Sequence, residues 1–231
     1  MNMPMGSALP DWLTPVAWIY IALSLLSAAL IATDIYLRNR RHPSTTTELV
    51  WITSALYLGP FAVPAYLSQG RASATTSTTY GTGDGTGAST AVAVLPGGGA
   101  SAVAHVVAVP LVVAVGWTIA GLAMWPMILV IAVLAIAMLA VYERASSRAG
   151  RTTAHRGLTI GAAVFAAVIT VLAFDVGMVG WMLLLHFNDL MPPATDVQFW
   201  FLMQIGILAG LLTGAPVVAR LRRTTRLAPA V

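Results

Sequence analysis

Asp175 lies within the stretch FDVGMVGWMLLLHF, residues 174–187, in which every other residue before the histidine is apolar or glycine. If this stretch is helical, four of its side chains share one face: Asp175, Met178, Met182 and His186. A carboxylate in such a stretch is a candidate proton or cation site, and thioethers with an imidazole would suit a soft cation such as Cu(I). Methionine is also a common filler of irregular packing, and a neutral carboxyl can hydrogen-bond two helices. The chemical and the structural interpretation therefore both stay open.

The composition indicates what surrounds this carboxylate. The chain of 231 residues is 58% hydrophobic and 9% charged, whereas soluble domains carry about 25% charged residues. The hydrophobic mass must therefore face lipid or other helices, and in lipid a helix satisfies its own backbone. In a helix predicted over residues 157–186, Asp175 lies about 16 Å from the outer end. A charge near the bilayer midplane costs at least about 2.5 kcal/mol, so we expect a protonated, paired or cavity-facing carboxyl.

Six apolar stretches are long enough to cross a bilayer, which needs about 20 residues in a helix. The second contains Pro60 and Pro64, which remove backbone donors and predict a kinked, broken or re-entrant segment. The predicted fold class is an all-α polytopic integral membrane bundle. Its helices are expected at residues 15–37, 48–67, 102–122, 126–143 and 157–186, with a sixth that is capped by Thr195 or Asp196 and ends near Leu221.

The stretches between these helices divide the chain into segments. Residues 68–100 are rich in Thr, Ser and Gly, a composition that cannot bury enough apolar surface and predicts a flexible low-complexity loop. A two-helix membrane segment, residues 1–67, precedes this loop. A four-helix membrane domain, residues 101–223, and a short tail, residues 224–231, follow it.

All twelve basic residues are arginines, and they leave two topologies open under the positive-inside rule. Six crossings with the N-terminus inside would leave Arg38, Arg40 and Arg41 outside. Five crossings, with residues 48–67 re-entrant and the N-terminus outside, would place all twelve in the cytoplasm. In both cases the C-terminus is cytoplasmic and the 187–196 loop is outside. We expect a multi-pass protein of the cytoplasmic (inner) membrane, with the lipid bilayer as its partner.

Several function classes have no support in the sequence. Without lysine there is no Schiff base to retinal or pyridoxal, and without cysteine there are no disulfides, thiolate zinc sites or iron–sulfur clusters. His105 and His186 are predicted at opposite membrane sides and make a poor pair of haem ligands. Hydrolase and metalloprotease motifs are not found, and the arginines flank spans as topology signals. We expect no enzyme, no cofactor and no nucleic-acid partner.

Other residues in the apolar stretches have structural or supporting roles. Gln204 is the preferred partner of Asp175, because the two would lie within about one helical turn in depth if their helices were antiparallel neighbours. Asp34 and Arg38, four residues apart, predict an ion pair at the membrane boundary. Small residues allow another helix to approach closely. That helix can belong to the same chain, to a second copy in a homo-oligomer, or to a partner in a membrane complex. The glycines expected to pack in this way are Gly206, Gly210, Gly214, Gly177 and Gly180.

Five motifs, in order DIYLRNRR, ALYLGPFAVPAY, GWTIAGLAMW, FDVGMVGWM and FWFLMQIG, resemble the bacterial multi-span membrane proteins of the family named domain of unknown function 4396. The resemblance covers residues 30–71 and about 100–222, and it implies no assigned activity. Members carry a Cys- and His-containing stretch with a following aspartate, which suggests metal handling. Here Ser101 stands where the cysteine aligns and His105 where the acid aligns, so a thiolate-dependent role is not carried over. Asp175 matches an acidic position of the family.

Two functions fit these observations. A small transporter or an ion- or metal-handling protein would explain the midplane acid, the broken second helix and the glycines. An accessory subunit of a membrane complex would explain the same glycines as packing and Asp175 as a hydrogen bond between helices. Transport requires Asp175 and Gln204 to line a polar cavity, whereas a dry, closely packed site would favour the accessory role.

Overall fold

The computed structural model describes residues 9–42, 45–71, 86–149 and 160–227, and these residues are helical apart from short connections. Six stretches of the described residues are long and apolar enough to cross a membrane. This confirms the predicted all-α class. The α-helices are α1 (Leu13–Tyr36), α2 (Thr45–Leu58), α3 (Ala62–Ala65), α4 (Thr86–Val115), α5 (Met124–Ala149), α6 (Ile160–Phe187) and α7 (Val197–Leu227).

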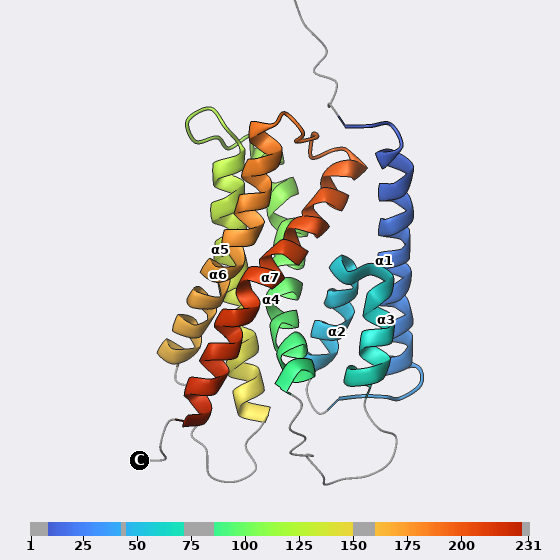
Figure 1. Ribbon diagram of the computed structural model, residues 1–231, viewed down its shortest axis with the longest axis vertical. Helices are drawn as coiled ribbons and strands as arrows, with labels where there is room; N and C mark the ends of the chain where they lie inside the picture. Colours follow the sequence, from blue (N-terminus) through green and yellow to red (C-terminus); the bar gives the residue numbers. More distant parts are fainter. Residues whose placement is uncertain (1–8, 43–44, 72–85, 150–159, 228–231) are drawn as a thin grey trace, which may run out of the picture.

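The long helices form one bundle, in which α6 packs against α7 and α4 packs against α5. In Figure 1, α1 stands at one side, α5 and α6 lie at the other, and α4 and α7 cross between them. The short helices α2 and α3 fill the space beside α1. The last helix begins at Val197, directly after Thr195 and Asp196, the two residues predicted as alternative caps.

The second apolar stretch, Thr45–Gly70, folds back on itself, and we call it the hairpin. Its two ends meet, since Nε2 of His42 lies 2.6 Å from the carbonyl oxygen of Gly70. The rings of Trp51 and Tyr66 are 5.7 Å apart, whereas fifteen residues of straight helix would separate them by about 22 Å. The hairpin therefore enters and leaves at one end of the bundle, and its tip reaches only part of the way up (Figure 1).

Gly59 makes the turn at the tip of the hairpin, where a 3-10 turn, Gly59–Phe61, joins α2 to α3. Its φ is +57°, a left-handed conformation that glycine adopts without steric cost. A Cβ at Gly59 would also lie 2.8 Å from Cζ of Tyr20 in α1. Tyr20 donates a hydrogen bond to the carbonyl oxygen of Tyr57 at 3.0 Å, so the tip is held against α1.

With the hairpin folded back, α1 and α4 to α7 run along the bundle, and the arginines of the described residues gather at one end of it. This arrangement is the one that the five-crossing topology predicts. This arginine end, the lower end in Figure 1, includes the connection after α1, the residue after the hairpin, and the ends of α5 and α7. The arginines concerned are Arg38, Arg40, Arg41, Arg71, Arg144, Arg148, Arg220, Arg222, Arg223 and Arg226.

The prediction for residues 68–100 is corrected by the structure. Helix α4 begins at Thr86 and ends at Val115, so the segment from 86 to 100 is helical rather than a flexible loop, and the helix ends earlier than residue 122. The glycines that predicted a loop are contact points, because a Cβ at Gly98 would lie 2.6 Å from the ring of Tyr57, and one at Gly99 would lie 2.5 Å from the hydroxyl of Thr53. The rest of the predicted loop lies outside the described residues, apart from its first residues in the hairpin.

Candidate functional site

Asp175 lies near the middle of α6, twelve residues or about 18 Å from the end of the helix at Phe187. It is partly buried and lines a small cavity of about 10 Å³ between α4, α5 and α6. The polar side chains that share this cavity are Ser101 of α4 and Thr170 of α6. Within the described residues no ion pair reaches the Asp175 carboxyl.

Gln204 does not meet Asp175 in the structure. Its amide nitrogen Nε2 donates to the carbonyl oxygen of Leu56 in the hairpin at 2.6 Å. The reason is the orientation of α7, which turns Gly206 toward α6, where a Cβ would lie 2.6 Å from the sulfur of Met178. Two residues correspond to about 200° around a helix, so Gln204 is on the opposite face.

The stripe predicted on α6 is divided between two environments. Met178 and Met182 are buried, and Met178 packs against Gly206 of α7, whereas Asp175 faces α4 and α5. His186 lies at the end of the helix, its ring 5.6 Å from that of Phe187. No group of three histidines, cysteines or acidic residues gathers anywhere in the described part of the chain. Neither the cavity of Asp175 nor the larger pocket between α1, α4 and α7 is lined by Met178, Met182 or His186, and the soft-metal site stays a prediction.

The predicted packing glycines differ in how closely the other helix approaches them. Gly177 fits against the backbone of α7 at Ala209, and a Cβ at Gly210 would lie 2.7 Å from the ring of Phe174. At Gly214 the nearest α6 atoms are 3.9 Å away, an ordinary contact. At Gly180 a Cβ would meet nothing within 4 Å, so this glycine makes no close approach within the described residues.

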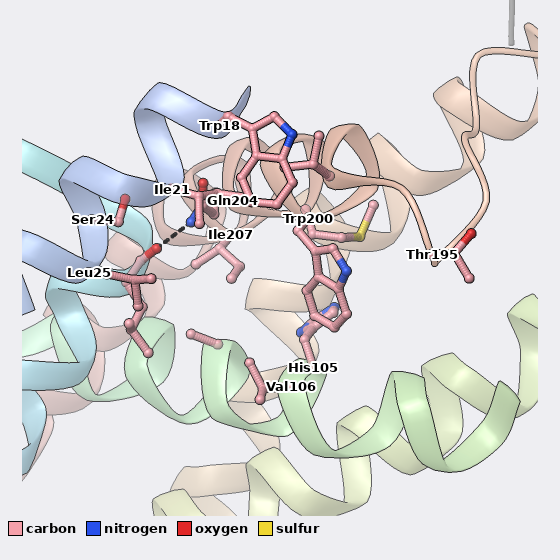
Figure 2. Close-up of a pocket in the computed structure, with 14 residues that line it drawn as sticks. Trp18, Ile21, Ser24, Leu25, His105, Val106, Thr195, Trp200, Gln204 and Ile207 are labelled. Carbon is pink, nitrogen blue, oxygen red and sulfur yellow. Dashed lines mark hydrogen bonds between the residues drawn. The ribbon is translucent and has the colours of Figure 1, made fainter. Parts of the chain in front are cut away.

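A larger pocket, of about 380 Å³, lies between α1, the hairpin tip, α4 and α7 (Figure 2). We call it the large pocket. Its lining is mostly aliphatic and aromatic, with Trp18 of α1 and Trp200 of α7 among the side chains that Figure 2 shows around it. The polar residues of the lining are Ser24, His105, Thr195 and Gln204.

His105 and Gln204 each place an unpaired hydrogen-bond acceptor in this region. Nδ1 of His105 lies 2.8 Å from the carbonyl oxygen of Ser101, and because a carbonyl only accepts, Nδ1 carries the proton. Nε2 of the neutral ring is then an acceptor. It is buried without a partner among the described residues, as is Oε1 of Gln204. Such atoms are rare in folded proteins and call for an explanation.

Ser101 connects the small cavity to the large pocket. It lines the cavity of Asp175, its carbonyl oxygen binds Nδ1 of His105, and its hydroxyl oxygen lies 3.4 Å from the same nitrogen. His105 lines the large pocket. We call Asp175, Ser101 and His105 the polar row. From the sequence these two α4 residues were identified only by alignment, although their spacing of four residues could have indicated a shared face.

The base of the hairpin is held at the arginine end by two buried carboxylates. Asp34, 7% exposed, accepts from Nη2 and Nε of Arg71 at 2.8 and 3.0 Å and from the hydroxyl of Tyr66 at 3.1 Å. The predicted partner Arg38 is present but more distant, at 3.6 Å. The hydrogen bond to Asp34 raises the pKa of Arg71 above its ordinary value, so this pair stays charged.

The second carboxylate is Glu48, which is fully buried. Its Oε1 accepts from Nε of Arg41 at 2.8 Å and from the backbone N–H of His42 at 2.9 Å. These two bonds satisfy Oε1, whereas Oε2 of Glu48 is buried without a partner among the described residues. Asp34 therefore fixes the end of the hairpin to the last turn of α1. Glu48 fixes the start of the hairpin to the connection that follows α1.

Together, the apolar helices and the polar groups inside the bundle define a polytopic helical membrane protein. The chain belongs to the family described as domain of unknown function (DUF4396), whose model matches residues 87–225. No curated protein and no solved structure matches the chain. Helix α1 and the hairpin precede the matched residues, which include Ser101, His105, Asp175 and Gln204.

Proposed function

We propose that this protein is a small membrane transporter for a mainly apolar solute that carries one hydrogen-bond donor. The observation that carries the proposal is the large pocket with its two unpaired acceptors, Nε2 of His105 and Oε1 of Gln204. Sites for small molecules are concave, mostly apolar and contain a few polar groups that fix orientation. A hydroxyl or N–H of the solute would satisfy an acceptor that otherwise stays desolvated at a cost of about 1–3 kcal/mol.

The hairpin supports transport rather than storage of the solute. Its tip forms part of the large pocket through Leu56, and Gln204 holds that residue by its carbonyl oxygen. A solute that engages Gln204 therefore acts on the same side chain that secures the tip. Because a re-entrant segment is tolerated only where protein or a cavity surrounds it, movement of this tip would open the pocket toward the arginine end. We place that end in the cytoplasm.

The test uses the fact that the chain has no cysteine. Ser24→Cys introduces one thiol into the lining of the large pocket, and Ser27→Cys introduces a matched thiol on the same helix that does not line it. Both serines are buried, with 1% and 4% of their surface exposed. In proteoliposomes, a membrane-impermeant thiol reagent is applied to one side or to the other.

A transporter exposes its pocket alternately, so Ser24→Cys is expected to react from both sides and Ser27→Cys from neither. Indole should protect the Ser24→Cys thiol better than 1-methylindole, which has the same ring system but a methyl group in place of the N–H hydrogen. If Ser24→Cys is unreactive from both sides, the transport proposal is wrong and the accessory-subunit alternative gains support.

A further inference from the structure

The carboxyl of Asp175 lines the small cavity and not the large pocket, so the proposed solute site does not include it. We propose that Asp175 is a proton-binding site whose state is transmitted to the large pocket through Ser101 and His105. The effect on the large pocket rests on the proposed function. The proton site itself rests only on the surroundings of Asp175.

The small cavity fits a proton and a water rather than a metal ion. Its volume of about 10 Å³ is close to the minimum that one water requires. Its polar side chains are one carboxyl and the hydroxyls of Ser101 and Thr170, whereas Ca²⁺ takes six to eight oxygen ligands. Protonation removes a charge from the middle of the bilayer without any further ligand.

The surroundings of Asp175 contain few groups that could compete for the proton. From α5 the cavity is lined by Ile131 and Ala135, and from α4 by Gly97 and Ser101. The described lining includes no residue of α7. Within the described part of the chain, Ser101 links this lining to one titratable side chain, His105.

Ser101 can transmit the state of Asp175 because a hydroxyl either donates or accepts. An ionised carboxylate accepts a hydrogen bond from the Ser101 hydroxyl, directly or through one water, and the hydroxyl oxygen is then free to face Nδ1–H of His105. A protonated Asp175 becomes the donor, so the hydroxyl proton of Ser101 turns away from the cavity and toward Nδ1–H. Two donors then face each other, which disfavours the present position of the His105 ring in the lining of the large pocket.

The first measurement follows the protonated carboxyl band by infrared difference spectroscopy across about pH 5–9, the range for a partly buried acid, in lipid nanodiscs. The wild type is compared with Asp175→Asn and with the exposed control Asp196→Asn. We expect a titrating band that is lost in Asp175→Asn and kept in Asp196→Asn. A carboxyl that stays protonated throughout would refute the proton site, while the labelling of Ser24→Cys would still decide on transport.

The second measurement is the rate at which Ser24→Cys reacts as pH changes. Asp175→Asn in the same background removes the part of the pH dependence that comes from Asp175. It leaves the part that comes from ionisation of the thiol itself. Where Asp175 changes its protonation state, we expect the reaction rates of Ser24→Cys with Asp175 and with Asp175→Asn to differ by about fivefold or more. Fivefold is the lower range of coupling between protein sites. Ser101→Ala should keep the infrared titration of Asp175 and abolish this difference, since the backbone bond to His105 remains. Coupling that survives Ser101→Ala would rule out this route.

Discussion

Replacing Gly177 by alanine tests how closely α6 and α7 approach. The added Cβ would lie 2.6 Å from the carbonyl carbon of Ala209 and 2.8 Å from the nitrogen of Gly210, whereas ordinary contact begins at 3.4 Å. The carbonyl oxygen of Ala209 lies closer still, and this backbone obstacle cannot rotate away. The helices must therefore separate by more than about 0.8 Å at this point, the difference between 3.4 and 2.6 Å. Overpacking of this kind typically costs about 1–3 kcal/mol.

The separation would also weaken the neighbouring contacts of the same interface. A gap of this size forfeits about a quarter to a half of the attraction between packed atoms. The pairs affected are Met178 with Gly206 and Phe174 with Gly210, which are now in close contact. The loss is therefore distributed along the interface rather than confined to one methyl group.

Gly180→Ala is the matched control, because its Cβ would meet nothing within 4 Å. Both variants gain the same helix propensity, about 1 kcal/mol, which cancels in the comparison. Unfolding in mixed detergent micelles should therefore show Gly177→Ala less stable than Gly180→Ala by about 1–3 kcal/mol. Equal stability of the two variants would show that α6 and α7 are not held this closely, and the argument from the glycines would fail.

Two further predictions concern the base of the hairpin. Arg71→Gln removes the two hydrogen bonds from the guanidinium to Asp34 and should lower the thermal midpoint of unfolding by a few degrees. Arg38→Gln is the control and should change the midpoint little, because Arg38 lies 3.6 Å from Asp34 and is largely exposed. A larger effect of Arg38→Gln than of Arg71→Gln would contradict the structure. Glu48→Gln keeps the shape of the side chain but loses its charge-assisted bond to Arg41. We expect the free energy of unfolding to fall by about 1.5–3 kcal/mol. No change in that free energy would show that the carboxylate is solvated rather than buried.

Much of the fold follows from local sequence properties, because the length of an apolar stretch determines whether it can cross a bilayer. Helix α6 begins and ends within a few residues of its prediction. The start of α4 does not follow in this way. Gly98 and Gly99 resemble a linker locally, yet they are helical because Tyr57 and Thr53 of another segment pack against them. That contact is non-local, and composition contains no sign of it.

The candidate site was predicted in part. The depth of Asp175 followed from counting residues, but its partner did not, since depth says nothing about which face of a helix meets a neighbour. The glycine ridge of α7 contained that information, because it marks the face turned to α6 and Gln204 lies on the other. The unpaired Nε2 of His105 depends on three packed elements and could not be derived from one helix.

The hairpin also has a consequence for the order in which the protein is assembled. Its base can form as soon as α1 and the hairpin have been synthesised, since Asp34, Arg41, Glu48 and Arg71 all lie in the first third of the chain. Its tip is different, because Leu56 is held by Gln204 of the last helix. A segment made early therefore reaches its final position only after α7 has been inserted. The last step of assembly is therefore expected to be the contact of the hairpin tip with α7.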